Sequence, residues 1–283
     1  MKLISYNLQN DKHSAVGIFT DRGVIPLSTL MPDAPNRIEA LIQSPYWEKL
    51  LKQPISNDIP AVNPDSLTWL PPIHRPGKIL CVGLNYRDHA LEGGRQVTEY
   101  PIIFLKASSA IIGHRQTVHL PQVSQMVDFE AELAVVIGEQ VIHCSAEHAY
   151  KYIAGYTILN DITARDYQRR TSQWTMGKSC DTFAPLGPVL VTADEIEDPH
   201  NLEITSTLNG NEMQRSNTRH LIFSIPFLIE YISSVMTLEP GDIISTGTPA
   251  GVGSFREPPV FLKSGDMVAI TVEKIGSLQN PVL

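Results

Sequence analysis

The stretch VDFEAELAVVIG, residues 127–138, decides the fold expected for this chain. Side chains alternate along a β-strand, so Asp128, Glu130 and Glu132 are predicted on one face of it. The uninterrupted apolar run at 134–137 predicts that the strand continues into the core. Carboxylates stacked on one face at the entrance of a core repel one another unless something compensates their charge.

Two interpretations of these carboxylates are open. One places them on a solvent-facing strand edge, where acidic side chains cost little. The other makes them ligands of Mg²⁺, Mn²⁺ or Ca²⁺, because clustered carboxylate oxygens without His or Cys suit hard cations. The segment 155–161 favours the second, since it predicts a strand that ends at Asp161 just before a helix, a usual place for ligands. The predicted cation site consists of three carboxylates: Glu130, Glu132 and Asp161.

The helix expected after Asp161 carries further candidates. Thr163 with Asp166 in the N3 place fits a capping box, which gives Asp166 a structural role. Arg165 and Gln168 are three residues apart, so they can point the same way. Lys178 follows in the tripeptide Gly-Lys-Ser. Taken singly, each is most simply a solvated polar group, but together they are the donors that a bound carboxylate or oxyanion needs.

A third candidate segment follows the predicted strand 78–82. His89 and Glu92 are three apart, so on a short helix they face each other as a proton-handling pair. Gly93-Gly94 would let this segment open and close as a lid. The plainer interpretation is a surface histidine beside an acid.

The glycine-rich segment 247–253 matches neither a dinucleotide fingerprint nor a phosphate loop. A turn that lines a pocket, with the Thr248 hydroxyl and backbone amides available, fits it better. A nicotinamide-dependent oxidoreductase would need this segment to open a long helix, and a metal-stabilised scaffold without activity would not need His89.

Short apolar runs bounded by Gly, Pro or Asp predict an α+β domain rich in β-structure. The expected strands are 3–6, 15–19, 23–26, 78–82, 102–105, 133–137, 153–159, 189–191, 202–208, 243–245 and 268–272, with a turn at Asn10-Asp11. The expected helices are 45–51, 145–153, 222–238 and the one starting at Thr163. A proline-rich break at 71–77 divides the chain into a small N-terminal domain, 1–70, and a larger domain, 71–283.

Composition excludes several classes of partner. The 283 residues carry 30 acidic and 22 basic side chains, a formal net charge of -8, so a nucleic-acid surface is not expected. No apolar run approaches the roughly 20 residues of a membrane span. Cys81, Cys144 and Cys180 are too far apart for a disulfide framework or a thiolate zinc site. The first residues have neither an apolar signal stretch nor an Arg-rich transit character, so a soluble, cytoplasmic protein is expected.

Taken together, these motifs resemble the fumarylacetoacetate hydrolase family. The segments that carry the resemblance are 83–89 (GLNYRDH), 101–106 (PIIFLK), 128–133 (DFEAEL), 160–166 (NDITARD), 177–179 (GKS) and 245–249 (STGTP). It implies a catalytic domain built as a mixed β-sandwich roll, a small N-terminal α/β domain and a homodimer.

The resemblance also implies roles for individual residues. Mg²⁺ or Mn²⁺ would lie on Glu130, Glu132 and Asp161, with His89, Glu92 and Lys178 catalytic and Arg165, Gln168 and Thr248 around the substrate. The implied substrates are small 2-oxo or 2,4-dioxo acids that react through a metal-stabilised enolate. The expected reaction is C–C hydrolysis of acylpyruvates; the alternative is oxaloacetate enol–keto tautomerisation, or oxaloacetate decarboxylation, in the same site.

Overall fold

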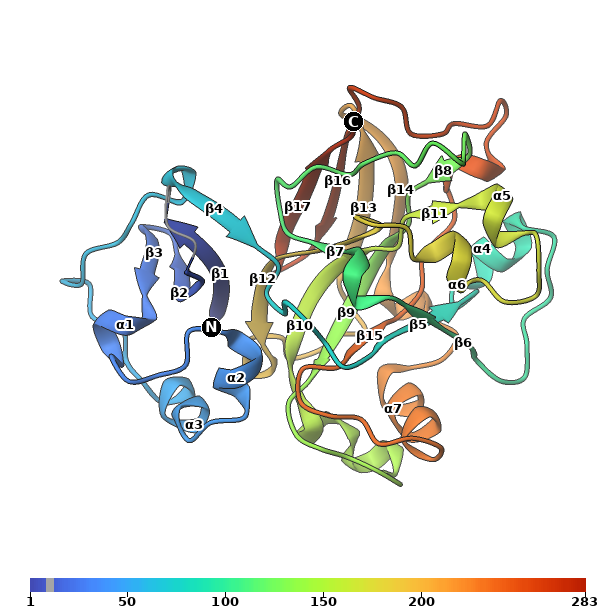
Figure 1. Ribbon diagram of the computed structural model, residues 1–283. Helices are drawn as coiled ribbons and strands as arrows, with labels where there is room; N and C mark the ends of the chain where they lie inside the picture. The colour runs from blue at the N-terminus through green and yellow to red at the C-terminus, as the bar shows by residue number, and fades with distance from the viewer. Residues whose placement is uncertain (9–12) are drawn as a thin grey trace.

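A large mixed sheet organises the computed structural model, which describes residues 1–8 and 13–283 (Figure 1). The turn predicted at Asn10-Asp11 lies outside these residues. The strands of this sheet run in the order β3-β2-β1-β12-β10-β9-β15-β5-β6, with β4 paired to β1 and β7 to β12. Their bounds are β1 Lys2–Leu8, β2 Ala15–Thr20, β3 Gly23–Pro26, β4 Leu67–Leu70, β5 Ile79–Gly83, β6 Ile102–Lys106, β7 Ile111–Ile112, β9 Ala131–Ile137, β10 Ile153–Asn160, β12 Ala184–Thr192 and β15 Ile243–Ser245.

Two smaller sheets and several short helices complete the fold. One sheet has the order β14-β13-β16-β17 and the other pairs β11 with β8. Their strands are β8 Val127–Asp128, β11 Thr163–Ala164, β13 Glu203–Leu208, β14 Asn211–Asn217, β16 Met267–Val272 and β17 Gly276–Pro281. The α-helices are α1 Leu27–Leu30, α2 Ile38–Ile42, α3 Tyr46–Leu51, α4 Arg87–Glu92, α5 Arg165–Gln168, α6 Thr175–Lys178 and α7 Ile225–Ser233. The expected strand-rich α+β class is confirmed.

The central strand β9 is buried on both faces, which explains its continuous apolar run. Leu133, Val135 and Ile137 pack into a core that includes residues of α7, β13 and β16. Ala134 and Val136 face a second core that includes residues of α2 and α3. The sheet is therefore a layer between two cores, and its centre has no solvent-facing side.

The N-terminal strands continue the central sheet. Lys2 of β1 pairs with Val191 of β12, and Leu3 with Leu190. Figure 1 shows β1 to β4 and α1 to α3 gathered on one side of the molecule, joined to the rest through β12. The division at residue 70 stays a prediction.

Three helix predictions differ from the structure. Residues 146–152 form a 3-10 helix rather than an α-helix. The helix predicted over 222–238 is confined to 225–233. It starts later than predicted because Ser224 is its N-cap and accepts from the Phe227 amide. The capping box at Thr163 is wrong. Thr163 pairs with Asp128 between β11 and β8, and α5 begins only at Arg165.

Within the described residues, no helix combines the length and apolar character that crossing a membrane requires.

We expect Leu133→Ala to lower the free energy of unfolding by about 2–5 kcal/mol, because the side chain is fully buried in the larger core. Urea denaturation followed by circular dichroism measures the change. Leu105→Ala is the matched control: this leucine also lies in a strand but is 46% exposed, so its loss should cost no more than about 0.5 kcal/mol. Equal costs for the two variants would contradict the assignment of β9 to the core.

Candidate active site

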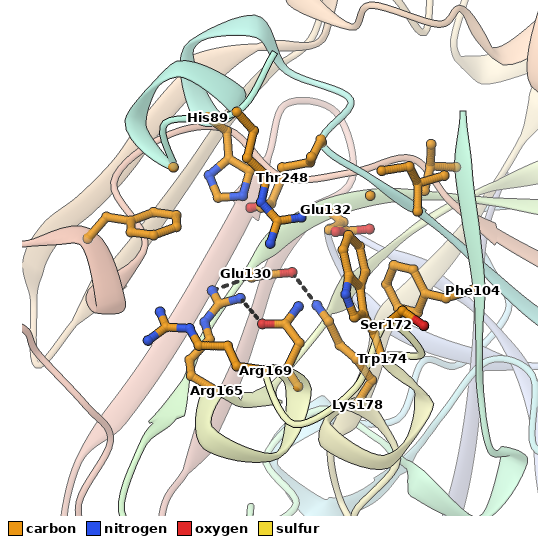
Figure 2. A pocket seen from close by; sticks show the side chains of 18 of the residues that line it. His89, Phe104, Glu130, Glu132, Arg165, Arg169, Ser172, Trp174, Lys178 and Thr248 are labelled. Carbon is orange, nitrogen blue, oxygen red and sulfur yellow. Dashed lines mark hydrogen bonds and ion pairs between the residues drawn. The ribbon is translucent and has the colours of Figure 1, made fainter. Parts of the chain in front are cut away.

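A cavity of about 560 Å³ opens where β5 and β15 end. These strands are parallel neighbours, so the segments that follow them meet at one edge of the sheet. Seven of the nine residues predicted for the site line this cavity: His89, Glu130, Glu132, Arg165, Gln168, Lys178 and Thr248. Figure 2 shows His89 on one side of the cavity and Glu130, Glu132 and Lys178 on the other side.

Backbone pairing brings the three predicted metal ligands together. The strand is interrupted at residues 129 and 130, between β8 and β9. Arg165 nevertheless contacts both Asp128 and Glu130, and Glu130 clusters with Glu132, so these acids stay near one another. The Asp161 amide donates to the Glu130 carbonyl at 3.0 Å. Glu132 pairs with Leu159 in the antiparallel register of β9 and β10. Asp161, directly after β10, therefore lies beside both glutamates.

Glu130, Glu132 and Asp161 are all buried, and one oxygen from each lies within 4.8 Å of the others. The interpretation of a solvent-facing strand edge is therefore wrong. Such clustering is costly unless positive charge compensates it.

Three buried cations provide part of that compensation. Lys178 Nζ lies between two acids, 2.7 Å from Glu130 Oε2 and 2.6 Å from Asp161 Oδ2. Lys106 Nζ is 2.6 Å from the other oxygen of Asp161. Arg165 contacts Glu130 Oε1 at 2.7 Å. Asp161 is thus held by two lysines, and of these Lys106 was not among the residues predicted for the site.

Asp128 holds Arg165 and is separate from the three-carboxylate cluster. Its Oδ2 accepts from Arg165 Nε at 2.9 Å, and its two oxygens accept from the amides of Gly253 and Ser254 at 2.8 and 2.9 Å. Asp166, predicted to cap the helix, instead accepts from the Ser124 hydroxyl at 2.6 Å.

The buried charges at this cavity do not balance. Four carboxylates, those of Asp128, Glu130, Glu132 and Asp161, face three cations, Lys106, Arg165 and Lys178. No cation of residues 1–8 or 13–283 contacts Glu132; its Oε2 accepts from the Ser245 hydroxyl and, at 3.0 Å, from the Gly247 amide.

The imbalance is visible in the acidities of the two glutamates. Burial, followed by the charges of Asp161 and Glu130, raises the pKa of Glu132 to about 8. Burial also acts to raise the pKa of Glu130, but Lys178 and Arg165 outweigh it and lower that pKa to about 2. One more cation beside Glu132 would remove the repulsion.

The residues present fit a hard divalent cation. They offer three clustered carboxylates, two of which line the cavity, without thiolate or imidazole in the set, and Mg²⁺ and Mn²⁺ prefer such oxygen ligands. With Glu132 ionised, a divalent ion would change the net charge of the seven groups from one negative to one positive. An anionic substrate would then be attracted despite the acidic composition of the chain.

His89 and Glu92 lie on α4, as the spacing of three residues predicts. His89 Nδ1 is 3.3 Å from Glu92 Oε2, and the ring is buried against Phe255. Glu92 also accepts from the Gly251 amide at 3.0 Å, which fixes α4 to the glycine-rich segment. The residues after β15 form a loop and a three-residue 3-10 helix, so no long helix of a dinucleotide fold starts there.

The remaining predicted donors border the same space. Arg165 donates to the side-chain oxygen of Gln168 at 3.1 Å. Thr248 accepts from the Gln214 amide at 2.7 Å, so its own hydroxyl hydrogen is directed to another acceptor.

Several site residues escaped the sequence analysis. Lys106 ends an otherwise apolar strand, and a buried lysine there is a signal of a paired charge. Ser245 and Gln214 have no local signal, because their partners are far away in sequence. Arg95 and Arg169 also line the cavity, and nothing in the sequence separates them from other surface arginines.

Several known proteins are similar to this chain in sequence and in fold. Residues 78–283 match the family described as fumarylacetoacetate (FAA) hydrolase C-terminal. A Rattus norvegicus protein named oxaloacetate tautomerase Fahd2a, mitochondrial, is 42% identical over 100% of this chain and 92% of its own.

Two solved structures are similar over the whole chain. The fumarylacetoacetate hydrolase of psychrophilic Exiguobacterium antarcticum has a TM-score of 0.86 and 32% identity, covering 100% of this chain and 99% of that one. The 5-carboxymethyl-2-hydroxymuconate delta-isomerase of Mycobacterium smegmatis has a TM-score of 0.78 and 37% identity, covering 100% and 98%. The fold implied by the family resemblance is therefore confirmed.

Glu132→Gln should weaken Mn²⁺ binding by more than about tenfold, because it removes one ligand and the uncompensated charge. Isothermal titration of metal-free protein measures the affinity. The same variant should lose the rise in melting temperature that Mn²⁺ produces in the wild type. Glu139→Gln, an exposed change just beyond β9, is the control and should bind as the wild type does. Wild-type affinity in Glu132→Gln would show that the ion lies elsewhere.

Proposed function

The chain belongs to the fumarylacetoacetate hydrolase family, and from that premise we propose that this enzyme is a divalent-metal-dependent oxaloacetate enol–keto tautomerase. One observation carries the proposal: His89, a proton-transfer group oriented by Glu92, lines the same cavity as the carboxylates of a cation site. The full-length relative named oxaloacetate tautomerase supports this choice over the acylpyruvate hydrolysis first expected from the sequence.

Glu130, Glu132 and Asp161 would hold Mg²⁺ or Mn²⁺. The bound ion would act as a Lewis acid that polarises the 2-oxo group and stabilises negative charge on its oxygen.

Protein side chains would bind and orient the substrate around that position. Arg165 and Gln168 are joined to each other and border the cavity, so they present fixed donors to a carboxylate. Thr248 adds a hydroxyl hydrogen. Lys178 lies between Glu130 and Asp161, and its ammonium offers a donor to developing oxyanion charge.

Tautomerisation requires one proton to leave the enol oxygen and one to arrive at the adjacent carbon. His89 is the group placed for this transfer, since its Nδ1 faces Glu92 and its other ring nitrogen is left for the substrate. Glu92 would fix the ring tautomer and orientation, and α4 would exclude water while the proton moves. The O–H bond breaks, a C–H bond forms and the double bond moves from C=C to C=O, so no co-reactant is needed.

Hydrolysis of a C–C bond in an acylpyruvate is the second candidate. The cavity volume of about 560 Å³ exceeds what a four-carbon acid needs, which leaves room for a longer chain. In that reaction His89 would take a proton from water that attacks the distal carbonyl. Oxaloacetate decarboxylation would use the same enolate-stabilising site.

A homodimer and a cytoplasmic location complete the proposal. Cys81, Cys144 and Cys180 are free thiols, which suits a reducing compartment. The name of the rat relative includes the word mitochondrial, so another reducing compartment is an alternative.

A substrate panel tests the reaction. With Mg²⁺, the protein should speed the decay of enol-oxaloacetate absorbance above the uncatalysed rate, without release of pyruvate, and a chelator should abolish this effect. Acetylpyruvate and fumarylpyruvate are assayed in parallel. Pyruvate release from either, with no effect on the enol, would reject the tautomerase in favour of the hydrolase. Activity indifferent to the chelator would reject the metal.

His89→Asn should lower kcat for the enol by about 10²–10⁴-fold, the usual worth of a general acid–base group. Metal affinity should not change, because the ring is not among the carboxylate ligands. His148→Asn, an exposed substitution on the neighbouring 3-10 helix segment 146–152, is the control. If His89→Asn retained the wild-type kcat, another group would have to carry the proton.

A further inference from the structure

We propose that Arg95 and Arg169 bind the far carboxylate of the substrate and make the enzyme selective for dicarboxylic over monocarboxylic 2-oxo acids. This inference rests on the proposed function, because it concerns the substrate of that same site. The cations around the cavity differ in whether they already pair with a protein carboxylate.

The two buried cations that line the cavity are already committed to protein carboxylates. Arg165 pairs with Asp128 and Glu130, and Lys178 with Glu130 and Asp161. They contribute donors to one end of a substrate, but their charges are balanced within the wall. With a divalent ion bound, the buried groups carry one net positive charge, which the first carboxylate of a substrate would balance. A second carboxylate would then need a further cation, in a chain of net charge -8.

Arg95 and Arg169 line the same cavity, and neither has an ion pair or side-chain hydrogen bond among residues 1–8 and 13–283. They reach it from different elements. Arg169 directly follows α5, next to Gln168, whereas Arg95 follows the glycines at the end of α4. Two uncommitted guanidinium groups therefore border the space, and their chain positions place them at its rim.

Arg95 is held by an aromatic support. Its guanidinium lies 5.6 Å from the centre of the Trp174 ring, in the range of a cation–π contact. Trp174 packs edge-to-face on Phe104, with ring centres 5.3 Å apart. This support limits the orientations of the guanidinium and lowers the entropy lost when it binds an anion. Figure 2 shows Trp174 and Phe104 together on one wall, with Arg169 near Arg165.

A guanidinium forms short, charge-assisted hydrogen bonds with a carboxylate, often two at once. A monocarboxylic acid has a methyl or acyl group at that position and leaves both arginines solvated. Both arginine side chains are exposed, so leaving them solvated costs little binding free energy. The discrimination is therefore a gain in affinity for the dicarboxylate, and it should appear in KM or Kd rather than in kcat.

The test uses two stable probes that differ only at the far end: L-malate has a carboxylate where 2-hydroxybutyrate has a methyl group. Isothermal titration of the full-length Mg²⁺-loaded protein should show about tenfold tighter binding of malate. Arg95→Gln and Arg169→Gln should each weaken malate by roughly fivefold and leave 2-hydroxybutyrate unchanged. The double variant should lose the preference, and each single variant should raise KM for enol-oxaloacetate with little change in kcat.

Neighbouring arginines provide matched controls. Arg170→Gln removes a guanidinium that lies 3.5 Å from the centre of the Tyr167 ring and does not line the cavity. Arg87→Gln removes an exposed arginine at the start of α4 that lines a different pocket. Both should bind malate as the wild type does.

The inference is overturned if the wild type binds malate no better than 2-hydroxybutyrate, or binds neither, or if the double variant keeps the preference. A malate preference without tautomerase activity would reject the proposed function and leave this inference standing. Tautomerase activity without a preference for malate would reject this inference and leave the proposed function standing.

Discussion

The excess of one buried carboxylate over the buried cations is the constraint on which the site depends. Glu130 and Asp161 are each satisfied by ammonium or guanidinium partners, whereas in the described part of the chain Glu132 is held only by neutral donors. Burying an uncompensated charge is expensive, and a fold that keeps one must gain something by it. A divalent cation would resolve the repulsion and at the same time give an acidic protein a local positive charge for an anionic substrate.

The loop after β15, residues 247–253, contacts three separate parts of the site. Successive backbone amides of the segment after β15 donate to three acids with different roles: Gly247 to Glu132, Gly251 to Glu92, and Gly253 to Asp128. The first acid belongs to the cation site, the second orients His89, and the third holds Arg165. The glycines allow this close approach: a Cβ on residue 253 would lie 1.9 Å from the Val260 carbonyl oxygen. The loop thus links α4, the proposed cation site and the acid that holds Arg165.

Local patterns in the sequence predicted a large part of this arrangement, and tertiary contacts account for what they missed. The strand 243–245 coincides with β15, and the His89–Glu92 spacing placed both side chains on one short helix, because such features depend on near neighbours. The prediction of a capping box at Thr163 is wrong because strand pairing with Asp128 outweighs the local preference for a helix start. The pairing of Asp161 with Lys106, 55 residues away, and that of Asp128 with Arg165 have no local signature. The interruption of the strand at residues 129–130 likewise has no local signature.

The most direct test of the account is a crystal structure of the protein grown with Mn²⁺, with anomalous diffraction recorded at the manganese edge. The charge imbalance predicts a single strong anomalous peak among the carboxylates of Glu130, Glu132 and Asp161. A peak elsewhere, or none while Glu132 keeps only its contacts to Ser245 and Gly247, would contradict it.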